Sequence, residues 1–184
     1  MASPINCLLI LVIPLLVTSL FYQVSVGQKL DDPYLKTLCQ KTSDPNFCFK
    51  TLKADPRTFA ASGDLNHLGL VTIAIAIDTV QVEVDEIPGI LKKLNDRVDI
   101  VRMENCQNDY NNALKILRDG AYTSFAAKDY NGAKSQVITA ANGLAACENS
   151  YKDPPARTSP LADALTKVLK KCNISVVVLN AITG

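Results

Sequence analysis

Two cysteines, Cys106 and Cys147, constrain the fold of this chain more than any other feature of its sequence. Each lies in a stretch whose apolar residues recur every three or four positions, which is typical of a helix with one buried face. The polar break at residues 127–129 lies midway between them, and about 20 residues of helix run outward from it in each direction. In an antiparallel hairpin the two sulfur atoms would therefore lie at the same height, where they can form a disulfide.

The two helices of this expected hairpin each have an apolar stripe and a polar face. The stripes comprise Met103, Cys106, Tyr110, Ala113 and Leu117 in the first helix and Tyr130, Ala133, Val137, Ala140, Leu144 and Cys147 in the second. The polar residues are Glu104, Asn108, Asn111, Lys115 and Arg118 in the first helix and Gln136, Thr139, Asn142 and Asn149 in the second. The pattern predicts a dry seam between the helices and a solvent-exposed face.

The first 27 residues have the features of a signal peptide. They carry no charged side chain, they include an apolar run over 7–16, and the small residues Ser25 and Gly27 suit cleavage before Gln28. A membrane anchor is the weaker alternative, because the apolar core is short for a span and Pro14 interrupts it. We therefore expect a signal peptide over 1–27 and a secreted mature chain, 28–184, that is not bound to a membrane.

Composition and charge limit what the mature chain can do. A chain of 184 residues with 48% hydrophobic residues is long enough for one domain with a real core. The net charge is +1 and no basic run exceeds a Lys-Lys pair, which argues against binding to nucleic acid or to an anionic membrane. A protein partner is the expected ligand. Removal of Cys7 from the six cysteines leaves five, which predicts two disulfides plus one thiol, or an intermolecular bond.

Residues 28–63 are expected to form an N-terminal helical arm. Asp-Pro pairs at 32–33, 44–45 and 55–56 each predict a helix start, with Asp as the N-cap and Pro at the first helical position. Cys39 and Cys48 lie evenly about a turn at 43–44. We interpret them as the staple of a helical hairpin that is too small to hold together without this bond.

A long helix is expected to begin at Asp64. Its apolar residues keep a spacing of three and four: Leu70, Ile73, Ile77, Val80, Val84, Ile87, Leu91 and Leu94. Pro88 and Gly89 interrupt this helix, but the stripe continues in phase beyond them. We therefore expect a kink at Pro88, with a break into two helices as the alternative.

A last helix is expected to start with Thr158 or Ser159 as its cap. Its apolar face comprises Leu161, Leu165, Val168, Cys172, Val176 and Leu179. The β-branched residues near its end would also suit a strand, but the unbroken phase from Leu161 favours a buried helix. Four long helices with short connections predict an all-α fold: an up-down-up-down four-helix bundle over 64–184, preceded by the arm.

Catalytic chemistry is hard to assemble from these residues. His67 has no second histidine and there is no Cys-x-x-Cys, so the spacing offers neither a metal site nor a Cys-His nucleophile. The acidic residues Glu83, Asp85 and Glu86 are interpreted as a solvated helix face. No Gly-x-Ser-x-Gly motif is present. The sequence therefore argues against an enzyme, and no cofactor is expected.

Two residues of the last helix have separate interpretations. Cys172 lies on the apolar stripe, which favours a buried, inert thiol over a redox or dimerising one. Asn173-Ile174-Ser175 is an N-glycosylation sequon in a chain expected to be secreted. Because it adjoins a helix that should pack into the bundle, an unused match and an occupied site are equally supported.

A wider set of residues resembles a known family pattern. It comprises Cys39 and Cys48 with Asp44-Pro45 between them, Leu52, Ala54-Asp55-Pro56-Arg57, Asp64-Leu65, Leu68-Gly69-Leu70, Cys106, Tyr110, Ala113, Asp129-Tyr130-Asn131, Ala145-Ala146-Cys147-Glu148 and Pro154-Pro155. This pattern is similar to the plant invertase and pectin methylesterase inhibitor family over essentially the whole mature chain. Cys172 also matches a cysteine that some members carry unpaired.

The resemblance implies an asymmetric four-helix bundle with an N-terminal helical hairpin, disulfides Cys39–Cys48 and Cys106–Cys147, and no catalysis. Members bind a cell-wall or vacuolar carbohydrate-active enzyme reversibly, in a one-to-one complex that covers its substrate cleft. We therefore expect secretion to the cell wall, or a vacuolar location if the target is an invertase.

The target divides the family into two branches. Invertase inhibitors that act through a Pro-Lys-Phe motif have it at the turn before the third bundle helix, where this chain has Lys128-Asp129-Tyr130-Asn131. That motif is missing, whereas residues 129–131, 147–148 and 154–155 resemble pectin methylesterase inhibitors. The resemblance thus favours pectin methylesterase as the partner and leaves acid invertase as the alternative.

Partner contacts are expected on the polar face of the hairpin and at its tip. The candidates are Asn108, Asn111, Lys115, Lys128, Asp129, Gln136 and Thr139. A secreted helical carrier of small ligands is a more distant alternative, which the alternation of Ala and Leu in the hairpin disfavours because it indicates tight packing.

The first prediction concerns processing. The secreted protein should begin at Gln28, within about two residues, because small residues precede that position as a signal peptidase requires. Intact-mass analysis of secreted protein measures this directly. Retention of residues 1–27 would contradict the extracellular location as well as the cleavage.

Overall fold

The computed structural model describes residues 31–61 and 63–184; the expected signal peptide lies outside these residues. Three short helices form the arm: α2 (Asp32–Cys39), α3 (Pro45–Ala54) and α4 (Pro56–Ala60). The bundle comprises α5 (Leu65–Leu91), α6 (Arg97–Lys115), the π-helix η1 (Ile116–Tyr122), α7 (Thr123–Ala126), α8 (Tyr130–Ser150) and α9 (Ala162–Thr183).

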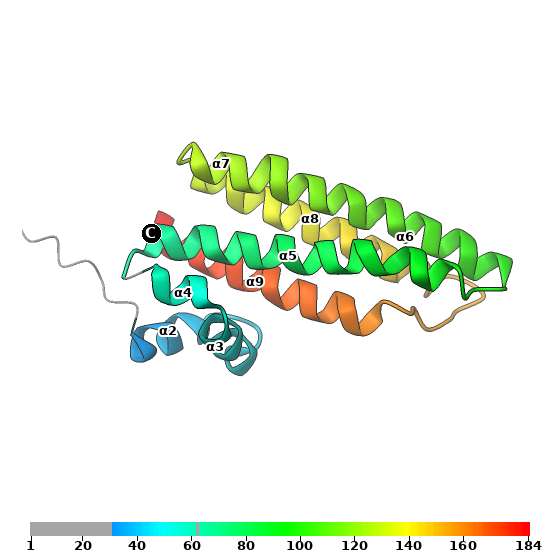
Figure 1. The fold of residues 1–184 in the computed structure, drawn as a ribbon, viewed down its shortest axis with the longest axis horizontal. Helices are drawn as coiled ribbons and strands as arrows, with labels where there is room; N and C mark the ends of the chain where they lie inside the picture. Colours follow the sequence, from blue (N-terminus) through cyan, green and yellow to red (C-terminus); the bar gives the residue numbers. More distant parts are fainter. Residues whose placement is uncertain (1–30, 62) are drawn as a thin grey trace, which may run out of the picture.

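The four long helices pack in the order expected of an up-down-up-down bundle (Figure 1). α5 packs against α6 and α9, and α8 packs against α6 and α9, so the helices form a closed ring of neighbours. η1 and α7 continue α6 to the hairpin tip, so the three segments act as one long helix. The all-α bundle is thus confirmed, and the last helix is helical throughout residues 174–179, where a strand was the alternative.

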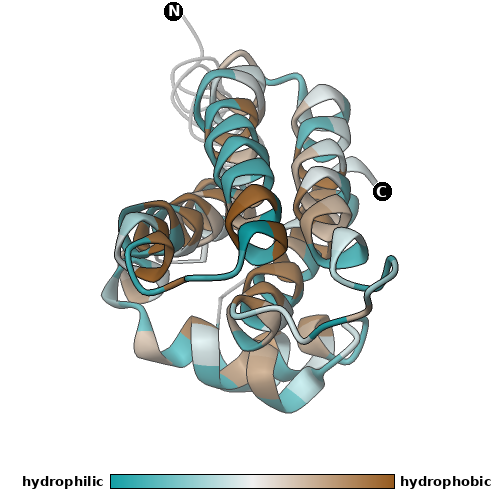
Figure 2. Ribbon diagram, turned by 90° about the vertical axis from the view of Figure 1, so that its right-hand side faces the viewer, coloured by the Kyte–Doolittle hydropathy of each residue, from teal (hydrophilic) through white to brown (hydrophobic). Residues whose placement is uncertain are grey.

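The α6–α8 hairpin has the predicted disulfide and the predicted dry seam. Cys106 and Cys147 are bonded with their Cα atoms 4.8 Å apart. The remaining stripe residues of both helices are buried, apart from the partly buried Tyr130. Figure 2 shows hydrophobic and hydrophilic residues together on each of the long helices, which is consistent with helices that bury one face and expose the other.

The arm also has its expected staple. Cys39 and Cys48 are bonded, which joins the end of α2 to α3. Both cysteines belong to a second apolar cluster, separate from the bundle core, that the arm shares with α5 and α9. Figure 1 shows the arm lying along these two helices. The arm is therefore held by its disulfide and by apolar contact with the bundle.

Helix α5 has two buried faces, of which the sequence pattern predicted one. Ile73 and Val80 belong to the bundle core, whereas Leu68, Val71 and Ile75 belong to the cluster under the arm. By length and composition α5 could span a membrane. The two clusters explain this composition, because a helix that is buried on two sides needs apolar residues on both of them.

Pro88 does not break α5. The helix continues through it to Leu91, so the alternative of two separate helices is wrong. Pro88 lies in the last turns of the helix and is exposed, where one missing N–H costs less than it would in the middle. Leu94, the last residue of the predicted stripe, lies beyond the helix end but still packs against the bundle core.

The helix caps differ from the predictions at two ends. Asp44 and Asp55 cap α3 and α4 as predicted, by accepting hydrogen bonds from the backbone N–H groups of Phe47 and Arg57 at 3.0 and 2.9 Å. In the first helix, however, the cap is Asp31 rather than Asp32. The predicted position was wrong by one residue because Pro33 occupies the second helical position.

The last helix begins later than predicted. Its N-cap residue is Leu161, whose side chain accepts no hydrogen bond from the backbone N–H groups of the first turn. Ser159 instead accepts a hydrogen bond from the backbone N–H of Leu161 at 3.1 Å. Neither Thr158 nor Ser159 is therefore the cap, because the turn at 160–161 lies between them and the helix.

The second prediction concerns the hairpin disulfide. Replacing both Cys106 and Cys147 with alanine should lower the free energy of unfolding by about 4 kcal/mol, because the bond closes a loop with a separation of 41 residues. Urea unfolding followed by circular dichroism measures this change. The control is Cys172→Ala, which leaves both disulfides intact and should cost about 1 kcal/mol. Equal costs for the two variants would contradict the prediction.

Candidate partner-binding face

The predicted contact residues of the hairpin lie on its outer side. Asn108, Asn111 and Lys115 are exposed along α6, and Thr139 is exposed on α8. Gln136 is partly buried, because its side chain packs against η1. These residues thus form two polar rows on neighbouring antiparallel helices. We call this surface the hairpin face.

The disulfide fixes the register of α6 against α8. Lys115 is nine residues along α6 from Cys106, and Ile138 is nine residues back along α8 from Cys147, so these two residues lie at the same height along the hairpin axis. The side chain of Ile138 is 42% exposed and adjoins Thr139. An exposed apolar side chain therefore lies beside Thr139 on α8, which sequence reasoning missed because Ile138 lies outside the apolar stripe.

A π-helix widens the first helix of the hairpin next to this face. η1 has no helix-breaking proline, and Gly120 lies within it. A Cβ atom at Gly120 would lie 3.0 Å from Cδ of Gln136, so glycine allows α8 to approach closely. The sequence indicated only a glycine of low helix propensity at this position. Widened turns of this kind are frequent at functional sites.

The hairpin tip is a closed turn. Lys128 has φ 63°, in the left-handed region, and its exposed side chain extends from the turn. The backbone N–H of Asp129 donates to the carbonyl oxygen of Ser124 at 2.9 Å. The carboxylate of Asp129 caps α8 by accepting from the N–H of Gly132 at 2.8 Å. Asp129 therefore has a structural role in this turn.

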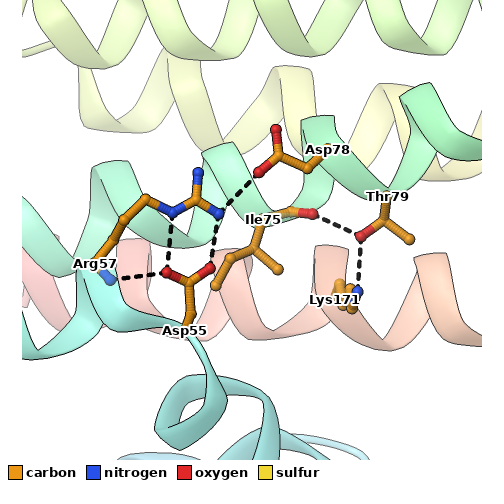
Figure 3. Close-up of polar contacts among 6 residues, drawn as sticks. All are labelled: Asp55, Arg57, Ile75, Asp78, Thr79 and Lys171. Carbon is orange, nitrogen blue, oxygen red and sulfur yellow. Dashed lines mark hydrogen bonds and ion pairs between the residues drawn. The ribbon is translucent and has the colours of Figure 1, made fainter.

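An ion-pair network connects the arm to the bundle. Arg57 donates two hydrogen bonds to Asp55, at 2.9 and 2.7 Å, and one to Asp78 of α5 at 2.8 Å (Figure 3). Its guanidinium lowers the pKa of the Asp55 carboxyl. The sequence indicated only that residues 54–57 belong to a family pattern, since Asp78 is 21 residues from Arg57.

No cluster of metal-coordinating side chains occurs in residues 31–61 and 63–184. His67 is exposed in the first turn of α5.

Comparison with known proteins identifies the family. The sequence profile described as plant invertase/pectin methylesterase inhibitor matches residues 33–178. The chain belongs to this inhibitor family.

Curated family members resemble the chain over most of its length. A pectinesterase inhibitor from Actinidia deliciosa is 29% identical over 175 residues, which cover 95% of this chain and 92% of the relative. Pectinesterase inhibitor 5 from Arabidopsis thaliana is 29% identical over 144 residues, 78% of this chain and 79% of the relative. A candidate invertase inhibitor from Platanus orientalis is 29% identical over 128 residues, which cover 68% of this chain and 74% of the relative.

Solved structures share the fold. A mutant form of a pectin methylesterase inhibitor from Arabidopsis superposes with a TM-score of 0.68 and 24% identity, over 79% of this chain and 95% of that chain. At this identity the likeness establishes the helical bundle with its arm.

The unpaired cysteine of this inhibitor lies in the bundle core. Cys172 is 2% exposed in α9 and forms no disulfide in the part of the chain that the structure describes. Burial raises the pKa of its thiol to about 12. The thiol is therefore protonated and inaccessible, as expected of an inert cysteine.

Asn173 has a structural contact. Its side-chain carbonyl oxygen accepts hydrogen bonds from the backbone N–H of Ser43 at 2.8 Å and from the hydroxyl of Ser43 at 3.2 Å. This connects α9 to the turn between α2 and α3. Glycosylation of Asn173 stays a prediction.

The third prediction concerns the reactivity of Cys172. Its thiolate fraction at about pH 8 should be about a thousandfold below that of an ordinary cysteine, because burial raises its pKa from 9.0 to about 12. Iodoacetamide should thus label Cys172 only after unfolding, which mass spectrometry of native and urea-treated protein measures. Rapid labelling of the native protein, or a bridge to Cys172 in a non-reducing peptide map, would contradict this result.

Proposed function

We propose that this protein is a secreted inhibitor of pectin methylesterase, which it binds reversibly and one-to-one across the substrate cleft. The observation that supports this most directly is the similarity to a pectinesterase inhibitor over 95% of the chain and 92% of the relative. The expected signal peptide would deliver the protein to the cell wall, where pectin and its esterase occur.

The hairpin tip favours pectin methylesterase over invertase. The Pro-Lys-Phe motif of invertase inhibitors would occupy this turn, but a proline at position 128 could not adopt the φ of 63° found there, because its ring fixes φ near about −65°. Acid invertase remains the alternative target, because a relative is also named as a candidate invertase inhibitor.

The hairpin face suits recognition of a protein surface. Its amide, ammonium and hydroxyl groups can hydrogen-bond to a polar partner, and Ile138 offers an apolar contact beside Thr139. The disulfide between α6 and α8 holds the two rows in place before binding. Little ordering entropy would then be lost on association, which favours a tight complex. Inhibition by this mechanism needs no chemistry, only coverage of the cleft.

The fourth prediction tests this face. The double variant Lys115→Glu/Thr139→Trp should weaken inhibition of pectin methylesterase by about tenfold, or about 1.4 kcal/mol, because it reverses a charge and adds bulk at the expected contact. Inhibition constants are measured against a plant pectin methylesterase and an acid invertase in parallel.

The matched control is Lys93→Glu, which reverses an exposed lysine in the turn after α5. It should inhibit like the unmodified protein, and all variants should keep the helical circular dichroism signal. Equal weakening by the control would argue against the hairpin face. Strong invertase inhibition with no effect on any pectin methylesterase tested would show that the target is invertase.

A further inference from the structure

A groove lies where the arm meets the bundle, along α5 and α9. It consists of two adjoining hollows of about 480 and 330 Å³, whose walls share Asp55, Ile75 and Lys171. Both volumes fall within the range of about 300–1,000 Å³ found for small-ligand sites. We call the larger hollow the arm groove. The arm and the α6–α8 hairpin lie on opposite sides of the bundle (Figure 1), so the arm groove is separate from the hairpin face.

The walls of the arm groove are fixed by polar contacts. Lys170 of α9 donates to the carboxylate of Asp44 at 2.8 Å. The contact between Asn173 and Ser43 joins the same helix to the arm, and the Arg57 network joins the arm to α5. The groove therefore exists before any ligand binds, and binding requires little ordering of the chain.

The arm groove has an excess of positive charge. Lys50, Lys167 and Lys171 lie in its wall, and none of them forms an ion pair among the described residues. Residues 1–30 and 62 include no Asp or Glu that could pair with them. Asp55 is a carboxylate in the same wall, but Arg57 already binds both of its oxygens.

Lys171 is the innermost of these cations. Its ammonium donates to the hydroxyl of Thr79 at 2.8 Å, and that hydroxyl donates to the carbonyl oxygen of Ile75 at 2.7 Å (Figure 3). Burial lowers the pKa of Lys171, and the charge of Lys167, one helical turn away, lowers it as well. The carboxylates of Asp78, Asp55 and Glu83 raise it. A bound anion would offset the first two effects.

Apart from Thr51, the rest of the wall is apolar. Phe47, Ala54 and Pro56 of the arm and Ile75 of α5 contribute this surface. The C–H faces of sugar rings pack on aromatic and aliphatic surface of this kind, while their charged substituents need cationic partners. The groove thus combines the two features that an acidic sugar requires.

We propose that the arm groove binds a short oligosaccharide of uronic acids, with carboxylates on Lys50, Lys167 and Lys171 and ring faces against Phe47 and Pro56. The choice of galacturonate as the sugar rests on the proposed function, because hydrolysis of the methyl esters of pectin exposes one carboxylate on each sugar unit. The inhibitor would then bind the product of its target enzyme at a site apart from the hairpin face.

The charges of the second hollow determine which way round the ligand lies in the groove. Its wall carries three carboxylates, Asp55, Asp78 and Glu83, against two cations, Arg57 and Lys171. A carboxylate placed there would be repelled, so the acidic groups of the ligand belong at the lysine end. Neutral hydroxyl groups can extend toward Thr79 and Asp78.

Isothermal titration calorimetry with tri-galacturonate tests the proposal on the whole mature protein, without any enzyme. The trimer should bind, its methyl ester should bind about tenfold more weakly or not at all, and added salt should weaken binding. Lys167→Gln/Lys171→Gln should lose about tenfold in affinity. The matched control, Lys92→Gln/Lys93→Gln, removes the same charge from the far end of α5 and should change affinity by less than about twofold. Lys50→Gln, at an exposed position, provides a second test if the first variant unfolds.

Three results would overturn the proposal. The groove variants could bind the trimer as well as the control does, the ester could bind as tightly as the acid, or a hexaglutamate peptide or inorganic phosphate could compete as effectively as the trimer. The last result would indicate an acidic protein segment or a general anion site. Because the titration contains no enzyme, its failure would leave the proposed inhibition of pectin methylesterase to be tested by the inhibition assay alone.

Discussion

The disulfide between Cys106 and Cys147 is the constraint on which the rest of the bundle depends. It joins α6 to α8 and so fixes their register. With the register fixed, the small side chains Ala113, Ala133 and Ala140 lie in the buried seam, and the polar rows lie outside. Both the tight core and the orientation of the hairpin face follow from this single covalent link together with helical periodicity.

The arm depends on a different combination of interactions. It has too few residues for a core of its own, so it shares one with α5 and α9 and is closed by the Cys39–Cys48 bond. The contacts of Arg57, Lys170 and Asn173 then fix its position against two bundle helices. Because Asp78 lies on α5 whereas Lys170 and Asn173 lie on α9, the position of the arm depends on both helices.

Local patterns predicted much of this structure, and long-range contacts explain what they missed. Helical phase and the position of turns were enough for the bundle and both disulfides. The same phase revealed only the Ile73 face of α5, because a helix buried on two sides has no clear polar boundary. The widened turn at Gly120 and the Arg57–Asp78 contact depend on neighbours that only the fold brings together. The cap at Asp31 differs from the prediction by one residue, within the usual spread of helix ends.

The closed turn at the hairpin tip limits how mutation could redirect this inhibitor to a different enzyme. Transplanting Pro-Lys-Phe from position 128 would demand a backbone angle that proline cannot adopt. Transplanting it from position 129 would remove both the N–H that donates to Ser124 and the carboxylate that caps α8. A switch of specificity in this scaffold would thus require a rebuilt connection between the two helices, with a different loop length or path, and not an exchange of three side chains.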